Sequence, residues 1–266
     1  KMPKKKTEEG KHSLLAPSSS ERWLHCTPSA LLEVQFPENT SSAADEGTAA
    51  HAWCEYKLKK ALHKRSKKPV TGYDSDEMQQ CSDDYVSYVI EQLEVCKLTC
   101  KDPVVLVEQR LDITSFIPGG FGTADCIIVA EDTMHIIDFK YGLGVWVNAE
   151  NNTQMMCYSL GALNHFANLY DIKYVTMHIV QPRRENVQSW KVTVEELLEW
   201  GNSYLKPRAK MALNGEGEFH CGSWCHFCRA KVKCRARAEE KLKLAEYEFK
   251  KPPLLADNEI EDVLKI

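Results

Sequence analysis

The sequence predicts an α/β protein in which a mixed sheet is flanked by helices, and three observations support this. Apolar residues recur at helical spacing in residues 43–62 and 83–100. From residue 103 the pattern changes to short apolar runs that are typical of strands. The runs 123–130 and 134–142 are joined by the short stretch "EDT" and predict an antiparallel hairpin, spanning 121–141, that anchors the sheet.

The expected elements follow one another in a fixed order. Short helices near 18–26 and 29–34 precede the two long helices, which a loop at 66–76 separates. Next come a strand at 103–113, a turn-rich loop at 115–122, the hairpin, a helix at 149–167, strands at 174–182 and 187–193, and a helix at 194–213 with a break near Pro207. The alternation of strands and helices after residue 103 favours an α/β architecture.

We expect one domain over residues 13–240, between a disordered tail at 1–12 and a second tail at 241–266. The domain has a helical part at 18–100, a core at 103–212 and a cysteine-rich segment at 219–238. The first twelve residues are charged and lack an apolar stretch, which argues against a secretory signal there. No run approaches the roughly 18–20 apolar residues that span a bilayer, so no membrane contact is expected.

Charge and cysteine content narrow the classes of protein. The net charge of −4 gives no argument for nucleic acid, although residues 57–68 and 229–243 are basic and 74–84 are acidic. Such runs are either solvated faces or parts of a site. Eleven cysteines are an odd number in a long chain, which disfavours a disulfide scaffold and predicts a reducing, cytoplasmic compartment.

Two carboxylates and a lysine on the hairpin indicate a metal site. Asp138 and Lys140 lie two apart on one strand and share a face. The hairpin can bring Asp125 beside Asp138, which predicts a site for Mg²⁺ or Mn²⁺ with a lysine next to it. The alternative is a surface hairpin with polar residues. The apolar neighbours of Asp138 argue against it, because an unpaired carboxylate is costly there.

Two helices carry further candidates. Gln154 and Tyr158 are four apart, and therefore on one face of the helix that follows the hairpin. His51 lies one turn after Gly47 in an early helix, and a neutral imidazole suits Mn²⁺ better than Mg²⁺. The alternative for His51 alone is a packed histidine without a ligand role. The alternative for Gln154 and Tyr158 alone is an ordinary contact on a helix surface.

Four short motifs occur together in order. They are G-x-x-x-H (Gly47, His51), G-x-x-D (Gly122, Asp125), D-x-K (Asp138, Lys140) and Q-x-x-x-Y (Gln154, Tyr158). The set resembles the RecB-like branch of the PD-(D/E)XK nuclease superfamily over roughly residues 18–238. The resemblance implies a restriction-endonuclease-like core and a metal-dependent deoxyribonuclease, with DNA as its partner.

The resemblance also assigns roles to individual residues. It implies that His51, Asp125, Asp138 and the carbonyl of Phe139 bind the metal and that Lys140 is catalytic. Gln154 and Tyr158 would support the site and the DNA backbone. The D-x-K motif has Asp where the superfamily more often has Glu. RecB itself shows the same variation. Glu108, on the preceding strand, is a further candidate for the same site.

The cysteine-rich segment "CGSWCHFCRAKVKC" leaves two interpretations open. Cys221 can complete a local four-thiolate zinc site with the cysteines of the C-x2-C-x5-C pattern: Cys225, Cys228 and Cys234. The segment is also similar to the AddB subunit and the CRISPR-associated iron–sulfur exonucleases. That resemblance implies a 4Fe–4S cluster on the three cysteines and Cys26, with Cys221 a bystander and the cluster joining both ends of the domain.

The predicted function is an exonuclease on DNA ends or single strands that serves recombination or DNA-end processing. No nucleotide-binding loop of the G-x-x-x-x-G-K-[ST] type occurs, so a helicase or recombination partner would be a separate protein. The chain resembles phage- or prophage-encoded relatives of the CRISPR-associated iron–sulfur nucleases, which would place the protein in the cytoplasm of a bacterial host. The rivals are a structure-specific endonuclease with the same site and a non-catalytic zinc- or DNA-binding module.

Overall fold

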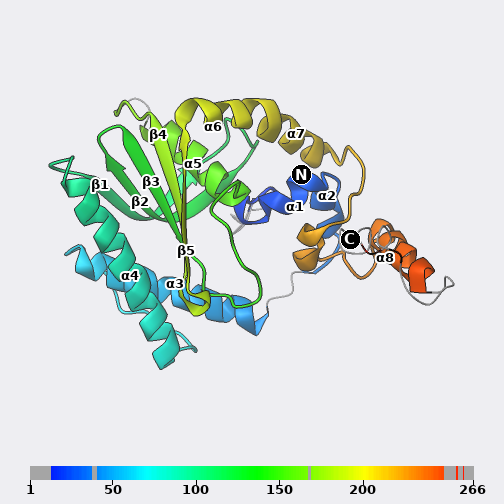
Figure 1. The fold of residues 1–266 in the computed structure, drawn as a ribbon, viewed down its shortest axis with the longest axis horizontal. Coiled ribbons are helices and arrows are strands. Elements are labelled where there is room, and N and C mark those ends of the chain that lie inside the picture. Colours follow the sequence, from blue (N-terminus) through cyan, green and yellow to red (C-terminus); the bar gives the residue numbers. More distant parts are fainter. Residues whose placement is uncertain (1–12, 38–40, 167–168, 249–255, 257–259, 261–266) are drawn as a thin grey trace, which may run out of the picture.

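A five-stranded sheet lies at the centre of the computed structural model, with strand order β1-β2-β3-β4-β5 (Figure 1). The structure describes residues 13–37, 41–166, 169–248, 256 and 260. The strands are β1 (Val104–Asp112), β2 (Phe121–Ala130), β3 (Thr133–Phe139), β4 (Tyr174–Gln181) and β5 (Asn186–Thr193). β3 and β4 are parallel, and the other neighbouring pairs are antiparallel. The prediction of a mixed sheet built around the 121–141 hairpin is therefore confirmed.

Helices cover both faces of this sheet (Figure 1). The helical segments of the chain include η1 (Pro17–Ser19), α1 (Ser20–His25), α2 (Ser29–Glu33), α3 (Ser42–Ala61), α4 (Asp76–Lys97), α5 (Thr153–Phe166), α6 (Val194–Trp200), α7 (Lys206–Asn214), and, away from the sheet, η4 (Ser223–Phe227) and α8 (Arg235–Glu248). Successive residues of a strand point to opposite faces, so Ile136 packs in the core under α5, α6 and α7, and Ile137 in the core under α3 and α4. Both side chains are fully buried.

Two helices differ from their predicted extent. α4 begins at Asp76 because Ser75 caps it by accepting a hydrogen bond from the backbone N–H of Met78 at 3.2 Å. The expected helix 194–213 is interrupted by a π-helical turn over Gly201–Leu205, between α6 and α7. The turn lies just before Pro207, whose ring and missing N–H disturb the regular hydrogen-bond ladder.

The predicted tails fall mostly outside the described residues. Residues 1–12 lie outside them, as do 249–255, 257–259 and 261–266. Helix α8 continues across position 240, where the domain was expected to end. None of the helices within the described ranges has the length and apolar character to cross a membrane.

A chain of hydrogen bonds lies under α4. His135 on β3 contacts His178 on β4 through Nδ1 and Nε2 at 3.0 Å. The other nitrogen of His178 lies 2.9 Å from the hydroxyl of Tyr88. Burial, with a smaller contribution from Lys191, lowers the pKa of His135 to about 4. Burial and the neighbouring ring lower the pKa of His178 to about 3, so both rings are neutral at pH 7.

We expect this pair to make the protein acid-sensitive. The unfolded histidines bind protons below about pH 6.5, whereas the folded ones resist until about pH 4. Stability should therefore be complete above pH 6.5 and fall towards pH 4, by up to about 1.4 kcal/mol per pH unit for each histidine. Urea unfolding of wild type and His178→Gln at several pH values measures this. A variant with the same pH slope as wild type would contradict the assignment.

Candidate active site

Three carboxylates lie in one row across the sheet. On β1 and β2, the pairs Val107↔Cys126 and Gln109↔Ala124 flank Glu108 and Asp125. On β2 and β3, the pair Cys126↔Ile137 stands next to Asp125 and Asp138. The two registers therefore align Glu108, Asp125 and Asp138, as the predicted hairpin requires for the latter two.

Helix α3 brings His51 to this row. Its Nδ1 lies 3.3 Å from Oδ1 of Asp125, and its ring packs edge-on against Phe139 at 5.4 Å between centroids. The other carboxylate oxygen of Asp125 accepts a hydrogen bond from the backbone N–H of Phe139 at 2.8 Å. Asp125 is thus held from both sides, by a helix and by the end of β3.

The strongest set of candidate metal ligands shares His51 and Asp125 with the predicted set and adds Glu108. Ligand atoms of His51, Glu108 and Asp125 all lie within 4.8 Å of one another. Among the described residues, Asp138 does not belong to such a group, and Phe139 contributes its N–H to Asp125. The carbonyl of Phe139 stays a predicted ligand. One imidazole and two carboxylates suit Mn²⁺ or Mg²⁺, so the donor set fits the expected ion.

The backbone at Glu108 supports a special role for this residue. Its φ is 53°, a left-handed conformation that is unfavourable for a glutamate. Strain of this kind persists where the surrounding structure enforces it, commonly at functional sites. Glu108 was the weakest candidate from sequence because strand patterning shows only that it is polar. The alignment with Asp125 became visible once both registers were known.

The crowded charges shift the pKa values of the site. Burial raises the pKa of Glu108 to about 7, and the negative Asp125 adds to the effect. Burial alone would lower the pKa of His51, but Asp125 outweighs it and raises it to about 9. Burial opposes ionisation of Asp125, yet the positive His51 lowers its pKa. Such an uneven distribution of protons among close carboxylates is typical of sites that bind cations or catalyse reactions.

Lys140 connects the carboxylates to helix α5. Its Nζ lies 2.9 Å from Oδ2 of Asp138, an ion-pair contact, and donates a hydrogen bond to Oε1 of Gln154 at 2.8 Å. The amide of Gln154 in turn donates to the hydroxyl of Tyr158 at 3.0 Å. Burial raises the pKa of Asp138, and Lys140 offsets this only in part. The D-x-K and Q-x-x-x-Y motifs therefore form one continuous chain of contacts.

The two motif glycines have different surroundings. A Cβ on Gly122 would come within 2.5 Å of Cε1 of Tyr158, so the glycine is needed for the tyrosine to reach the site. At Gly47 a Cβ would meet no atom of the described chain within 4 Å. The space beside Gly47 is therefore open among the described residues, which leaves room for a substrate to approach.

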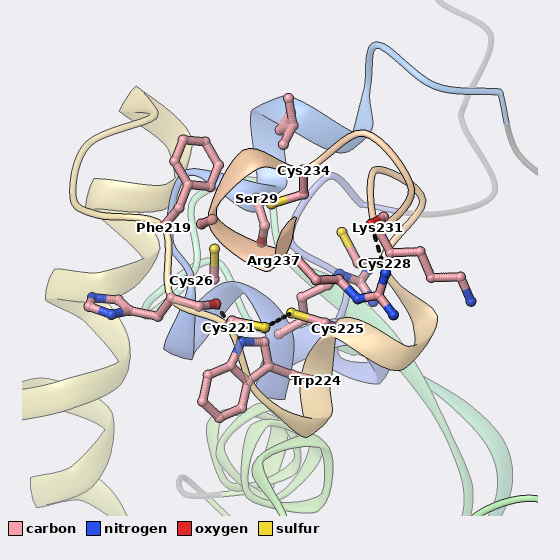
Figure 2. Close-up of a pocket in the computed structure, with 14 residues that line it drawn as sticks. Cys26, Ser29, Phe219, Cys221, Trp224, Cys225, Cys228, Lys231, Cys234 and Arg237 are labelled. Carbon is pink, nitrogen blue, oxygen red and sulfur yellow. Dashed lines mark hydrogen bonds between the residues drawn. The ribbon is translucent and has the colours of Figure 1, made fainter. Parts of the chain in front are cut away.

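A second cluster gathers the cysteines of both chain ends (Figure 2). Cys26, which follows α1, lines one pocket together with Cys221, Cys225, Cys228 and Cys234. Cys221 and Cys225 lie 3.9 Å apart between sulfur atoms. In the described part of the chain, no three of these thiols lie within 4.8 Å of one another. Two thiolate sulfurs bound to the same tetrahedral zinc ion lie about 3.8 Å apart, because each Zn–S bond is about 2.3 Å long.

Basic side chains lie beside the cysteine thiols in this pocket. Arg22, Lys231 and Arg237 line it beside the thiols. Burial raises the pKa of Cys26 and raises that of Cys228 to about 11, so both are protonated without a metal. A cation or cluster that binds here must displace those protons, and the three basic side chains would offset the charge of the thiolates.

Contacts without cysteine also join the two ends of the domain. The buried carboxylate of Glu33 on α2 accepts hydrogen bonds from Nε of Arg22 and from the backbone N–H of Arg229, both at 2.7 Å. The hydroxyl of Thr27 donates to the carbonyl of Glu216 at 2.5 Å. Cys26 is therefore placed near the later cysteines by the fold itself.

A basic groove begins close to His51. Residues four apart on a helix share a face, so His51, Glu55 and Lys59 lie along one side of α3. Glu55 and Lys59 form an ion pair and line an open groove of about 780 Å³. The other groove residues are Ala52, Tyr56, Arg65, Ser66, Lys67, Lys68 and Pro69. Four cations against one carboxylate make the groove positive, so the basic run 57–68 belongs partly to a surface beside the site.

The fold and site together define an α/β protein with a histidine–carboxylate–lysine centre at one sheet end and a five-cysteine pocket. The chain belongs to the DUF2800 family, described as a protein of unknown function, whose sequence profile matches residues 12–266. Among solved structures it is similar to a protein from Eubacterium rectale described as "Putative exonuclease", with 13% identity, a TM-score of 0.42, and coverage of 86% of this chain and 93% of that chain. It is also similar to SSO0001, with 12% identity, a TM-score of 0.29, and coverage of 70% and 95%, respectively.

Proposed function

We propose that this protein is a metal-dependent deoxyribonuclease that acts as an exonuclease on DNA ends or single strands. The observation that carries the proposal is the row of Glu108, Asp125 and Asp138, with His51 on one side and Lys140 on the other. Hydrolysis of a phosphodiester needs an activated water and a positive environment for the anionic transition state. This set of side chains can meet both requirements, the first through a metal ion held by the carboxylates and His51, and the second through that ion and Lys140.

The residues divide these tasks between them. His51, Glu108, Asp125 and Asp138 would hold Mg²⁺ or Mn²⁺, which supplies a water of lowered pKa and charge stabilisation when bound. Lys140 lies beside Asp138, where its ammonium group can orient the attacking water or stabilise negative charge on the phosphate. Gln154 and Tyr158 keep the lysine in place through hydrogen bonds of 2.8 and 3.0 Å.

The basic groove supports a polyanionic substrate. It starts on the face of α3 that carries His51 and extends past Lys59 to Arg65 and Lys67. Among the described residues Arg65 and Lys67 form no ion pair, so they are available to phosphates. Backbone phosphates bound along such a groove give affinity that does not depend on base sequence.

For the cysteine pocket we propose a 4Fe–4S cluster held by Cys26, Cys225, Cys228 and Cys234. The support is that all four line one pocket and that, among the described residues, no three of the thiols lie within 4.8 Å of one another. The rival is zinc bound locally through Cys221, which the 3.9 Å approach of Cys221 to Cys225 favours. The cluster would have a structural role by joining α1 to the segment before α8.

Degradation of end-labelled single-stranded and duplex DNA tests the proposal. Wild-type protein with Mn²⁺ or Mg²⁺ should release labelled products, and Asp138→Ala or excess chelator should abolish the release. A circular single strand should stay intact, and its cleavage would favour the structure-specific endonuclease instead. Wild-type protein with its metals in place that degrades none of these substrates would exclude a nuclease and leave a DNA-binding module.

A further inference from the structure

Residues 142–148 connect the two halves of the proposed catalytic chain. This loop follows Lys140 and Tyr141 at the end of β3 and precedes α5, which carries Gln154 (Figure 1). Lys140 and Gln154 are themselves hydrogen-bonded at 2.8 Å. Both ends of the connection that contains this loop therefore lie at the proposed reaction centre.

Two buried side chains of the β4–β5 hairpin hold the backbone of this loop. Gln181 and Asn186 are each 1% exposed, although both are polar. The amide nitrogen of Gln181 donates to the carbonyls of Gly142 and Val145 at 2.6 and 2.8 Å. Asn186 donates to the carbonyl of Val147 at 2.9 Å. Hydrogen bonds from buried side-chain amides to the backbone of a loop restrict the loop to one conformation.

The fixed loop turns apolar side chains outward. Leu143 is 48% exposed, Val145 43% and Trp146 47%. In a mobile loop, apolar side chains can be exposed simply because the loop has no fixed conformation. In this loop the backbone is held by internal hydrogen bonds, so the exposure belongs to one defined conformation. Three exposed apolar side chains on a rigid segment indicate a binding surface.

The ring of Trp146 is oriented and has a cation beside it. Its Nε1 donates a hydrogen bond to Oδ1 of Asn148 at 3.0 Å. The guanidinium of Arg184 lies 5.7 Å from the ring centroid and also donates to the carbonyl of Leu143. An aromatic face next to an arginine is the combination that binds an unpaired base together with its phosphate.

We propose that Trp146 is a stacking platform for an unpaired base of single-stranded DNA, with Arg184 contacting the adjacent phosphate. The inference rests on the proposed nuclease function and deepens it by naming the substrate form that the site prefers. Bases in a duplex have their faces covered by neighbouring pairs, so the platform selects strands whose bases are free. The platform lies on the loop that connects Lys140 to the helix of Gln154, so it belongs to the same segment of chain as the proposed reaction centre.

Binding of short labelled oligothymidine to the non-cleaving variant Asp138→Asn tests this. Adding Trp146→Ala should weaken binding at least about fivefold, the effect of losing one stacked base. Trp146→Phe should retain most of the affinity. An abasic strand of equal length has the same phosphates without bases, so Trp146→Ala should leave its affinity unchanged. Phe227→Ala provides a matched control, because Phe227 is also exposed, at 67%, but lies in the cysteine-rich segment.

Several results would overturn the platform. If the Asp138→Asn protein binds oligothymidine equally well with and without Trp146→Ala, stacking on Trp146 is excluded. Equal losses on oligothymidine and on the abasic strand would mean that the ring supports the backbone path and not a base. A dimer in sedimentation that Trp146→Ala dissociates, without a change in DNA affinity, would assign the surface to a second copy of the chain.

These outcomes are distinguishable from failure of the nuclease proposal itself. Binding is measured with a protein that cannot cleave, so base-dependent binding can be present when wild type proves inactive. Conversely, an active enzyme whose KM for single strands is unaffected by Trp146→Ala would retain the nuclease proposal and exclude the platform. With the platform present, Trp146→Ala should raise KM for single strands and change kcat little.

Discussion

Replacing Lys140 by alanine is expected to lower kcat for DNA hydrolysis by about 10²–10³-fold, the effect of removing one preorganised positive group from a transition state. DNA affinity in the presence of Mn²⁺ should change only a few-fold. The side chain of Lys140 is 24% exposed and its Nζ lies 2.9 Å from Asp138, so its charge acts at short range. Single-turnover cleavage of a labelled strand, with a parallel binding measurement, separates the two effects.

Lys140→Ala also leaves the carboxylate of Asp138 buried without its cation. Thermal unfolding with and without Mn²⁺ therefore accompanies the kinetic measurement, because loss of folding would imitate loss of catalysis. Tyr158→Phe is the matched control: it removes a hydroxyl bound to Gln154 and should lower kcat far less than Lys140→Ala. A Lys140→Ala protein that is folded and active within tenfold of wild type would remove the lysine from the mechanism.

Replacing Cys26 by serine is expected to abolish the metal centre of the cysteine pocket, whereas Cys221→Ser should keep it. Anaerobically purified wild type should contain iron and sulfide and absorb broadly in the visible region. Cys26→Ser should lose both, since a cluster needs its fourth thiolate ligand. Iron and zinc analysis of the three proteins, together with their spectra, measures the difference.

The two cysteine variants are controls for each other because both residues line the same pocket. The contacts of Glu33 with Arg22 and with the backbone of Arg229 do not involve cysteine, so they should keep the chain ends together in either variant. Zinc that survives Cys26→Ser and is lost in Cys221→Ser would establish the local four-cysteine site instead. Wild type without bound iron or zinc would exclude both centres.

The sequence was sufficient to predict much of the row of carboxylates and its neighbours. The two-residue period of a strand and the short turn in the 121–141 hairpin determine that Asp125 meets Asp138 and that Lys140 shares the face of Asp138. Helical spacing alone puts Gln154 next to Tyr158. These relations are local, so the backbone geometry of one hairpin or one helix is enough to derive them.

Other members of the two sites depended on contacts between distant segments. Glu108 joins Asp125 because the register of β1 against β2 aligns them, and no local pattern specifies that register. His51 reaches the row because α3 packs across the sheet, and Gly47 faces open space because no described segment packs against it there. The exposure of Trp146 follows from Gln181 and Asn186, which are polar residues that sequence patterning cannot distinguish from ordinary loop neighbours.

The sequence by itself determined the α/β class, the hairpin, the order of the elements and the spacing of the motif residues, because periodicity and turn chemistry act over a few residues. Only the tertiary structure decided that Glu108 stands beside His51 and Asp125 and that Cys26 faces the pocket of the later cysteines. It alone showed that a loop held by buried amide side chains exposes Trp146. These arrangements depend on strand register, helix packing and buried hydrogen bonds between segments far apart in the chain, and burial then sets the pKa values of the groups that meet there.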